Sequence, residues 1–271
     1  MSIGIIAGKG ELPISLAHYA RSVGLEPYVA VMEGFGDVLS FRDFSAKVFK
    51  IGYVGQILNF FKDSNIKKLV FAGKVDRPKW SDLRIDDMGR MLLFRILKNE
   101  VLGDDSLMNI IANFVQEKGF AIVAPADFLH SCEISITTNS IPSQEDMGDI
   151  ELGIKAAKLL GQVDVGQAVV VERGCVLGVE GQEGTDALIQ RCQSLKKYDN
   201  PSGILIKALK PIQSSKLDPP VVGPDTIVKL AQGGFRGVAL ERGAVIIIEP
   251  DRVLSLANQF ELFVYQYNSC L

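Results

Sequence analysis

Short apolar runs alternate with segments of helical apolar spacing along the first half of the chain. The run at residues 3–7 leads into a glycine turn and then into a segment whose apolar residues recur every three or four positions. The same pattern predicts further strands at 28–32, 46–51, 67–73 and 120–125, and helices at 53–63, 81–98 and 104–118. Such alternation indicates α/β crossover units on a parallel sheet.

The second half has a different pattern, in which short strands are also joined by tight turns. Strands are expected at 168–172 and 176–180 around Arg173 and Gly174, and then at 204–209, 237–241 and 244–249, with helices at 149–163, 186–195 and 225–234. This mixture predicts a mixed-sheet α/β domain. Residues 131–147 are rich in Ser, Thr and Asn and suit a connection. We therefore expect an N-terminal domain at 1–134 and a C-terminal domain at 135–271, as the length of 271 residues also favours.

Composition narrows the functional classes. The net charge of -3 gives no bulk attraction to nucleic acid, so no nucleic-acid partner is expected. The sequence contains neither an apolar run of the roughly 18–20 residues that a membrane span needs nor a signal sequence, which favours a cytoplasmic protein. Only two histidines are present. The chemistry must therefore depend mainly on carboxylates, lysines, hydroxyls or a hard metal ion.

The first candidate site is the glycine turn that contains Gly8 and Gly10 and is followed by Leu12 and Pro13. A glycine turn before a helix lets the backbone approach a phosphate, and the first amides of the helix favour an anion. However, Pro13 stands where a dinucleotide-binding motif has its third glycine. A ligand loop and a purely structural turn therefore both remain open.

Two further candidates lie in the first half. Lys74 and Arg77 follow the strand expected at 67–73 and could hold phosphate oxygens at the carboxyl end of the sheet, although a solvated loop is the alternative. Asp104 and Asp105 begin an expected helix, where they could bind a metal ion or substrate, or simply cap free backbone amides.

The second half has two denser groups of polar residues. Glu180, Glu183 and Asp186, together with Thr185, lie at a strand-to-helix turn, and such oxygen ligands suit Mg²⁺ together with substrate phosphates. The long segment 207–226 combines Lys207 and Lys210 with several prolines, which is typical of an ordered functional loop. A capping turn and a rigid surface loop are the respective structural alternatives.

The segments IGIIAGKGELP, FAGKVDRP, GDDSLM, QEGTDALI and KPIQSSKLDPPVVGPDT, in this order, resemble the LpxI-type UDP-2,3-diacylglucosamine diphosphatases of lipid A biosynthesis. The resemblance implies a Rossmann-like N-terminal domain and a catalytic C-terminal domain, with the lipid between them. It also implies hydrolysis of UDP-2,3-diacylglucosamine to UMP and 2,3-diacylglucosamine 1-phosphate, with Mg²⁺ or else Mn²⁺. The family's essential aspartate matches Asp218, and Asp225 is the second choice.

The resemblance, together with the residue types, assigns an expected role to each candidate residue. Asp218, Glu183 and Asp186 are the expected metal ligands. The expected substrate-binding residues are Gly8, Gly10, Leu12, Pro13, Lys74, Arg77, Asp104, Asp105, Gln182, Gly184, Thr185, Lys207, Lys210 and Gln213. The resemblance further implies transient contact with the inner-membrane surface and leaves a homodimer open.

Three other functions compete with this one. A binuclear metallophosphoesterase needs more histidines than the chain has, and a nicotinamide dehydrogenase needs the missing third glycine. A regulatory module that binds a UDP-sugar without cleaving it remains the alternative. The carboxylates disfavour it, because they would only repel a polyanion in the absence of a metal.

Overall fold

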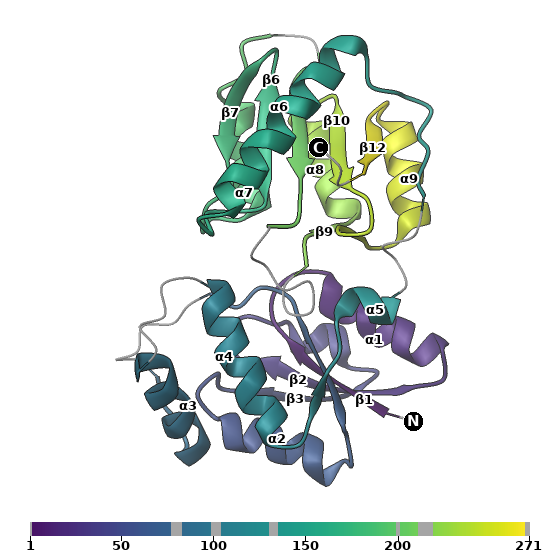
Figure 1. The fold of residues 1–271 in the computed structure, drawn as a ribbon. Helices are drawn as coiled ribbons and strands as arrows, with labels where there is room; N and C mark the ends of the chain where they lie inside the picture. Colours follow the sequence, from purple (N-terminus) through teal and green to yellow (C-terminus); the bar gives the residue numbers. More distant parts are fainter. Residues whose placement is uncertain are drawn as a thin grey trace. The chain divides into compact units, whose positions relative to one another are not determined.

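The computed structural model describes residues 2–76, 83–98, 104–129, 135–198, 201–210 and 219–268, without the side chains of 104–106. The described residues up to Leu129 form one compact unit, and those from Ser135 onward form a second (Figure 1). The boundary expected after residue 134 falls beside a segment outside the described residues, so it stays a prediction.

The first unit is built on a parallel sheet of five strands in the order β3-β2-β1-β4-β5. Every strand pair is parallel, as the sequence predicted. The strand order reverses between β1 and β4, which is where ligands bind in open sheets of this kind. The strands are β1 (Ser2–Ala7), β2 (Glu26–Met32), β3 (Ser45–Phe49), β4 (Lys68–Ala72) and β5 (Ala121–Ile122).

Helices cover both faces of this sheet. Buried residues of α2, α3 and α4 share one hydrophobic cluster with side chains of the sheet. On the other face, α1 and α5 meet through an edge-to-face contact between Tyr19 and Phe128. The helices are α1 (Leu12–Ser22), α2 (Val54–Asp63), α3 (Asp87–Lys98), α4 (Asp104–Glu117) and α5 (Pro125–Leu129), with a 3-10 turn η1 at Val38–Phe41.

The second unit contains a mixed five-stranded sheet in the order β12-β10-β8-β6-β7. β8, β10 and β12 run parallel, whereas β6 is antiparallel to both β7 and β8. The strands are β6 (Ala168–Glu172), β7 (Cys175–Val179), β8 (Ile204–Lys207), β10 (Gly237–Glu241) and β12 (Phe263–Tyr267), and a separate parallel pair is formed by β9 (Val221–Val222) and β11 (Ile246–Ile247). The mixed-sheet prediction for this half is confirmed.

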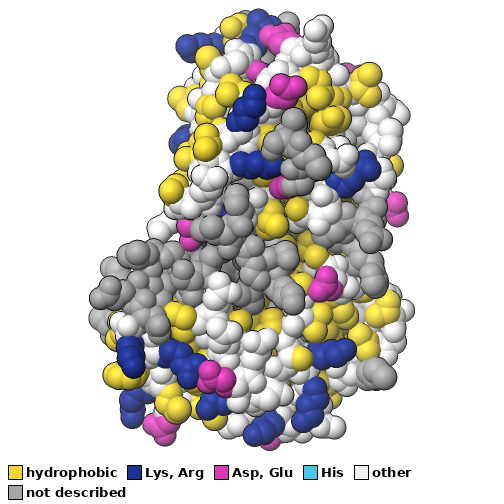
Figure 2. Space-filling view, in the orientation of Figure 1, with side chains coloured by type: hydrophobic (Ala, Val, Ile, Leu, Met, Phe, Trp, Pro, Cys, Tyr) yellow, Lys and Arg dark blue, Asp and Glu magenta, His cyan; other side chains and the backbone are white. Residues whose placement is uncertain are grey.

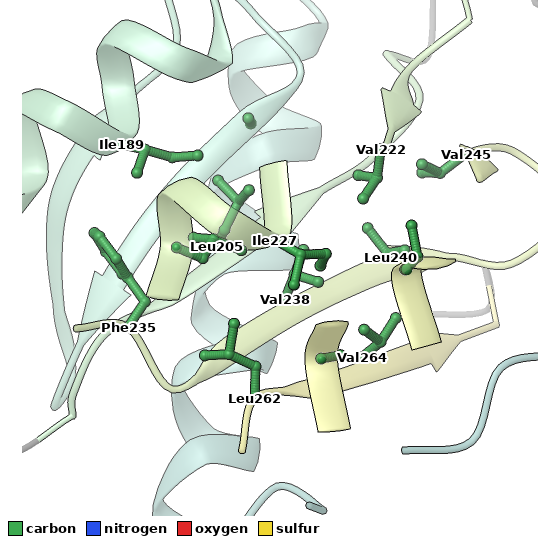
Figure 3. Packing of buried hydrophobic residues seen from close by; sticks show 14 of the residues in the cluster. Ile189, Leu205, Val222, Ile227, Phe235, Val238, Leu240, Val245, Leu262 and Val264 are labelled. Atoms are coloured by element: carbon green, nitrogen blue, oxygen red, sulfur yellow. The ribbon is translucent and has the colours of Figure 1, made fainter. Parts of the chain in front are cut away.

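Two hydrophobic clusters fill the faces of this second sheet. Side chains of α7, α8 and α9 pack with one face, and Figure 3 shows Ile189, Leu205 and Val238 from different elements pointing toward one another. α6 packs on the other face. Because the central strands are buried on both sides, they appear in the sequence as continuous apolar runs. The helices are α6 (Gln144–Gly161), α7 (Thr185–Gln193), α8 (Pro224–Gln232) and α9 (Pro250–Gln259).

Some expected boundaries were wrong. α6 begins at Gln144, inside the expected connection, because Ser143 and Asp146 form a reciprocal capping box there. The strand expected at 120–125 is limited to β5, since Pro125 starts α5. The strand expected at 244–249 is limited to β11, and Pro250 then begins α9, a helix that the apolar pattern did not reveal. Proline is favoured in the first helical turn because it has no N–H to leave unpaired.

Candidate functional site

In the first unit, the loops that follow β1 and β4 are joined through their backbones. The backbones of Lys9 and Lys74 exchange two hydrogen bonds, with nitrogen-to-oxygen distances of 2.8 and 3.0 Å, and the Gly8 N–H donates to the Ala72 carbonyl at 2.8 Å. A β-carbon at Gly8 would lie 2.5 Å from the Lys74 carbonyl oxygen. Gly8 therefore has a structural reason to be glycine, namely the close approach of two backbones.

Gly10 differs from Gly8 because it faces open space. Its φ is +98°, and no atom of the described residues lies within 4 Å of the position that a β-carbon would occupy. Leu12 and Pro13 are buried in the first turn of α1, so their side chains pack rather than line an open surface. Within the expected glycine loop, the exposed backbone is thus at Gly10.

Charged side chains also lie at these loops. The Lys9 ammonium is 2.6 Å from an Asp76 carboxylate oxygen, and both side chains are about half exposed. The hydrogen bond from Lys9 lowers the pKa of Asp76, and the nearby Lys74 charge acts in the same direction. Lys9 was not among the predicted site residues, although its place between two glycines of the turn could have suggested it.

The side chains of three other predicted residues of the first unit lie outside the part of the chain that the structure describes. Asp104 is the first residue of α4 and Asp105 the second, a position that complements a helix dipole, but their side chains lie outside the description. Arg77 lies outside the described residues. The roles assigned to these three residues stay predictions.

In the second unit, two predicted residues meet at the carboxyl end of β8. Lys207, which is only 5% exposed, donates from Nζ to Thr185 Oγ1 at 2.9 Å and to the Val221 carbonyl at 2.8 Å. The Thr185 hydroxyl donates to Oε1 of the buried Glu180 at 2.9 Å. Glu180 also accepts from the Gln167 N–H at 3.3 Å. These contacts form a chain in which Glu180 and Lys207 are buried and Thr185 and Val221 are partly buried, and we call it the Lys207 network (Glu180, Thr185, Lys207 and Val221).

Further polar groups surround the same end of the sheet. Lys210 and Asp164 form an ion pair at 2.5 Å, with both side chains largely buried. The Glu241 carboxylate accepts from the Leu209 N–H at 2.8 Å. The Tyr267 hydroxyl donates to the Lys207 carbonyl at 3.3 Å. Burial, followed by the Glu241 charge, raises the pKa of Tyr267, so this phenol stays protonated.

Asp164, Glu241 and Tyr267 were missed by the sequence analysis. Glu241 and Tyr267 are the last residues of buried strands, and this position is the signal that could have indicated them. Asp164 lies in the turn after α6 and has a φ of +57°, a backbone conformation that the sequence pattern does not reveal.

Two of the expected metal ligands are already paired with basic side chains. Glu183 accepts from Arg191 at 2.8 Å and from the Gly181 N–H at 3.0 Å, and the Arg191 hydrogen bond is the main reason that the pKa of Glu183 is lowered. Asp186 pairs with Lys229. Within the described parts of the chain, no three His, Cys, Asp or Glu side chains are grouped so that they could hold a metal ion.

The remaining predicted residues of the second unit lie near helix starts or outside the description. Gln182 is exposed in the turn before α7, and Gly184, with φ +85°, immediately precedes that helix. Asp225 is exposed in the first turn of α8. Asp218 and Gln213 lie outside the described residues. Their expected roles stay predictions.

A separate pocket lies at the opposite end of the second sheet and contains no predicted residue. Its carboxylates have hydrogen-bond partners: the Arg236 guanidinium donates to Asp146 at 2.9 Å, and Asp149 accepts from the backbone N–H of Arg173 at 2.7 Å. These contacts give the pocket a structural explanation.

Of the helices in the described ranges, none has the length and apolar character needed to cross a membrane.

Two solved structures show weak likenesses to this chain. WbmG of Bordetella bronchiseptica, in complex with NAD and UDP, is 13% identical, with 97% of this chain and 96% of that chain covered and a TM-score of 0.31. N5-carboxyaminoimidazole ribonucleotide synthetase of Thermotoga maritima is 14% identical, with 74% and 44% covered and a TM-score of 0.22. These scores are too low to establish a shared fold.

Comparison with protein families and curated proteins is far more specific. The LpxI N-terminal domain matches residues 2–132, and the LpxI C-terminal domain matches residues 133–265. A curated protein of Caulobacter vibrioides, UDP-2,3-diacylglucosamine pyrophosphatase LpxI, is 32% identical over 97% of this chain and 96% of its own length. The resemblance carried by the five sequence segments is therefore confirmed, and the chain belongs to the LpxI family.

Proposed function

We propose that this protein hydrolyses the diphosphate of UDP-2,3-diacylglucosamine to UMP and 2,3-diacylglucosamine 1-phosphate, as a step of lipid A biosynthesis. The observation that carries the proposal is the match, over almost the whole of both chains, to a protein named as a UDP-2,3-diacylglucosamine pyrophosphatase. Both family domains match in the same order and together cover residues 2–265.

The reaction requires a water molecule to attack one phosphorus while the oxygen that bridges the two phosphorus atoms leaves. Because the substrate is highly charged, catalysis depends mainly on orientation and on cations placed near the phosphate oxygens. We assign the orientation of the water to Asp218, with Asp225 as the second choice. Lys74, Lys207 and Lys210 are the proposed partners of the phosphate oxygens.

The Lys207 network supports a role for the carboxyl end of the second sheet. Lys207 as a whole is only 5% exposed, so its ammonium has lost most of its hydration and its charge acts more strongly on a bound anion than a surface charge would. α7 also begins here, and Gly184 provides no side chain to cap its first amides. Uncapped amides at a helix start favour a phosphate, which supports the roles proposed for Gln182, Gly184 and Thr185.

Mg²⁺, or Mn²⁺ in its place, is proposed as the cofactor and would neutralise part of the diphosphate charge. The described residues do not by themselves fit such an ion, because Glu183 and Asp186 are each bound to a basic side chain. A site there requires Asp218 and the opening of at least one of these two ion pairs. We therefore assign no step of the reaction to the metal.

The substrate also determines where the enzyme should work. A diacylated sugar nucleotide resides in a lipid layer, so we propose that the protein acts in the cytoplasm at the surface of the inner membrane. Contact with that surface would be peripheral.

The test is an assay of UMP release from detergent-dispersed UDP-2,3-diacylglucosamine by the purified protein. Asp218→Asn and added EDTA are compared with the untreated wild type, and Asp225→Asn tests the second choice. UMP release that falls on Asp218→Asn supports the assignment. Tight binding of the substrate without UMP release by the wild type would refute the hydrolase and favour the regulatory UDP-sugar-binding module.

A further inference from the structure

α3 exposes three large apolar side chains on one face. Met91, Phe94 and Leu97 are 55%, 71% and 61% exposed, and their spacing of three residues places them side by side along the helix. The opposite face buries Gly89, Leu92 and Ile96. α3 packs on α2 and α4 and lies at the edge of the first unit (Figure 1). We call the outward side, with Arg90, Met91, Phe94, Leu97 and Lys98, the α3 face.

Basic side chains flank the apolar ones on the α3 face. Arg90 and Lys98 are both exposed and project from the same side of the helix as Phe94, given 3.6 residues per turn. Among the described residues of α3, the acidic side chain on this side is Asp87, and one of its carboxylate oxygens lies 3.4 Å from an Arg90 guanidinium nitrogen. Figure 2 shows hydrophobic and basic side chains next to one another over this part of the first unit. Counted over the described residues of α3 on this side, two basic side chains against one acidic, the α3 face has an apolar centre and a net positive charge.

The size of the α3 face argues against a stable protein partner. A helix of 12 residues is about 18 Å long, so one face of it offers on the order of 200 Å². A specific protein interface buries about 800 Å² on each side. A lipid surface sets no such minimum, since an amphipathic helix can lie in the headgroup region with its apolar side chains in the acyl boundary.

We propose that the α3 face is the surface through which this protein docks on a membrane that contains anionic lipid. Met91, Phe94 and Leu97 enter the acyl boundary, while Arg90 and Lys98 contact the anionic headgroups. The choice of a lipid surface as the partner rests on the proposed function, because the substrate proposed there resides in a membrane. The position of the docking surface rests on the exposure and charge of α3 alone.

Vesicle binding by the full-length protein tests this proposal. We compare vesicles rich in phosphatidylglycerol with vesicles of pure phosphatidylcholine, using sedimentation of the bound protein. Phe94→Ser combined with Leu97→Ser should weaken binding to the anionic vesicles about tenfold or more. Arg90→Gln and Lys98→Gln should each weaken it about fivefold and should reduce its dependence on salt.

The matched control is Leu39→Ser in η1, because Leu39 is 76% exposed and belongs to the same unit. It should change vesicle binding by less than about twofold. Circular dichroism and unfolding midpoints would verify that all variants fold. Binding of the Phe94→Ser and Leu97→Ser double variant at wild-type strength would overturn the proposal. A wild-type dimer that this double variant converts to monomer would also overturn it, in favour of a second copy.

UMP release from detergent-dispersed substrate separates the docking proposal from the proposed function. Variants of the α3 face that lose vesicle binding but keep the wild-type rate in detergent would support docking. A wild type that releases UMP but binds no anionic vesicles would overturn docking and leave the hydrolase intact. Vesicle binding that depends on α3 without any UMP release would support docking and refute the hydrolase.

Discussion

Replacement of the buried Lys207 by methionine should destabilise the second unit strongly. Methionine has a similar length and fills most of the same volume, so the main loss is polar. The ammonium donates to Thr185 Oγ1 and to the Val221 carbonyl, and both bonds are shorter than 3 Å. Hydrogen bonds from a charged group contribute about 1.5–3 kcal/mol each, so we expect the free energy of unfolding to fall by about 3 kcal/mol or more.

The assay is urea unfolding followed by far-ultraviolet circular dichroism. Lys155→Met is the control, because Lys155 is exposed on α6 and its replacement should change the free energy of unfolding by less than about 0.5 kcal/mol. Thr185→Val removes the hydroxyl between Lys207 and Glu180. A double-mutant cycle of Thr185→Val with Lys207→Met should then give a coupling energy above about 0.5 kcal/mol, since the two side chains share a hydrogen bond.

A Lys207→Met protein as stable as the Lys155→Met control would refute this reasoning. It would mean that the buried ammonium gains no more from its partners than it loses in hydration. If Lys207→Met is destabilised but the cycle shows no coupling, the contribution comes from the Val221 contact rather than from Thr185.

Three further predictions concern other parts of the molecule. Burial opposes ionisation of Asp146, but hydrogen bonds from Arg236 and the helix cap prevail and lower its pKa below the ordinary 3.8. The stabilising effect of the ionised carboxylate should therefore be complete above that value and be lost as the pH falls further. Asp146→Asn should lower the free energy of unfolding by about 1–3 kcal/mol at neutral pH and by less in acid, as urea midpoints at both pH values would show. Gly8→Ala should destabilise the first unit by roughly 1–3 kcal/mol, because the new methyl group meets backbone, whereas Gly10→Ala should cost only about 1 kcal/mol of backbone strain; equal midpoints would contradict this distinction. EDTA should abolish UMP release, and added Mg²⁺ should restore it. Glu183→Gln should raise the Mg²⁺ concentration needed for half-maximal rate. An unchanged Mg²⁺ concentration for half-maximal rate would mean that Glu183 is not a metal ligand.

The apolar pattern predicted most strands because it follows directly from burial. Strands such as β6 and β8 are buried on both faces, so no polar residue can interrupt them without cost. α9 was not predicted because it has no long apolar stripe. Its sequence signals are a proline in the first turn and a narrow buried side formed by Val253 and Ala257. The early start of α6 depends on a capping box, whose two hydrogen bonds exist only once the turn has formed.

The candidate site was only partly visible in the sequence. Thr185 and Lys207 were both selected, but they are 22 residues apart, and only the sheet brings Nζ within 2.9 Å of Oγ1. Similarly, the carboxylate of Glu183 suggested a metal ligand, whereas the tertiary structure places Arg191 against it. A residue type indicates what a side chain can bind, and its neighbours decide what it does bind.

The sequence by itself determined the α/β class, the parallel first sheet, the mixed second sheet and the family, because each depends on local periodicity or on ordered motifs. Only the tertiary structure decided that Gly8 serves the approach of two backbones, that Lys207 is buried in a network, and that Phe94 remains exposed on α3. These properties depend on which segments, distant in the sequence, pack together. Close packing sets them through contacts that no local pattern encodes.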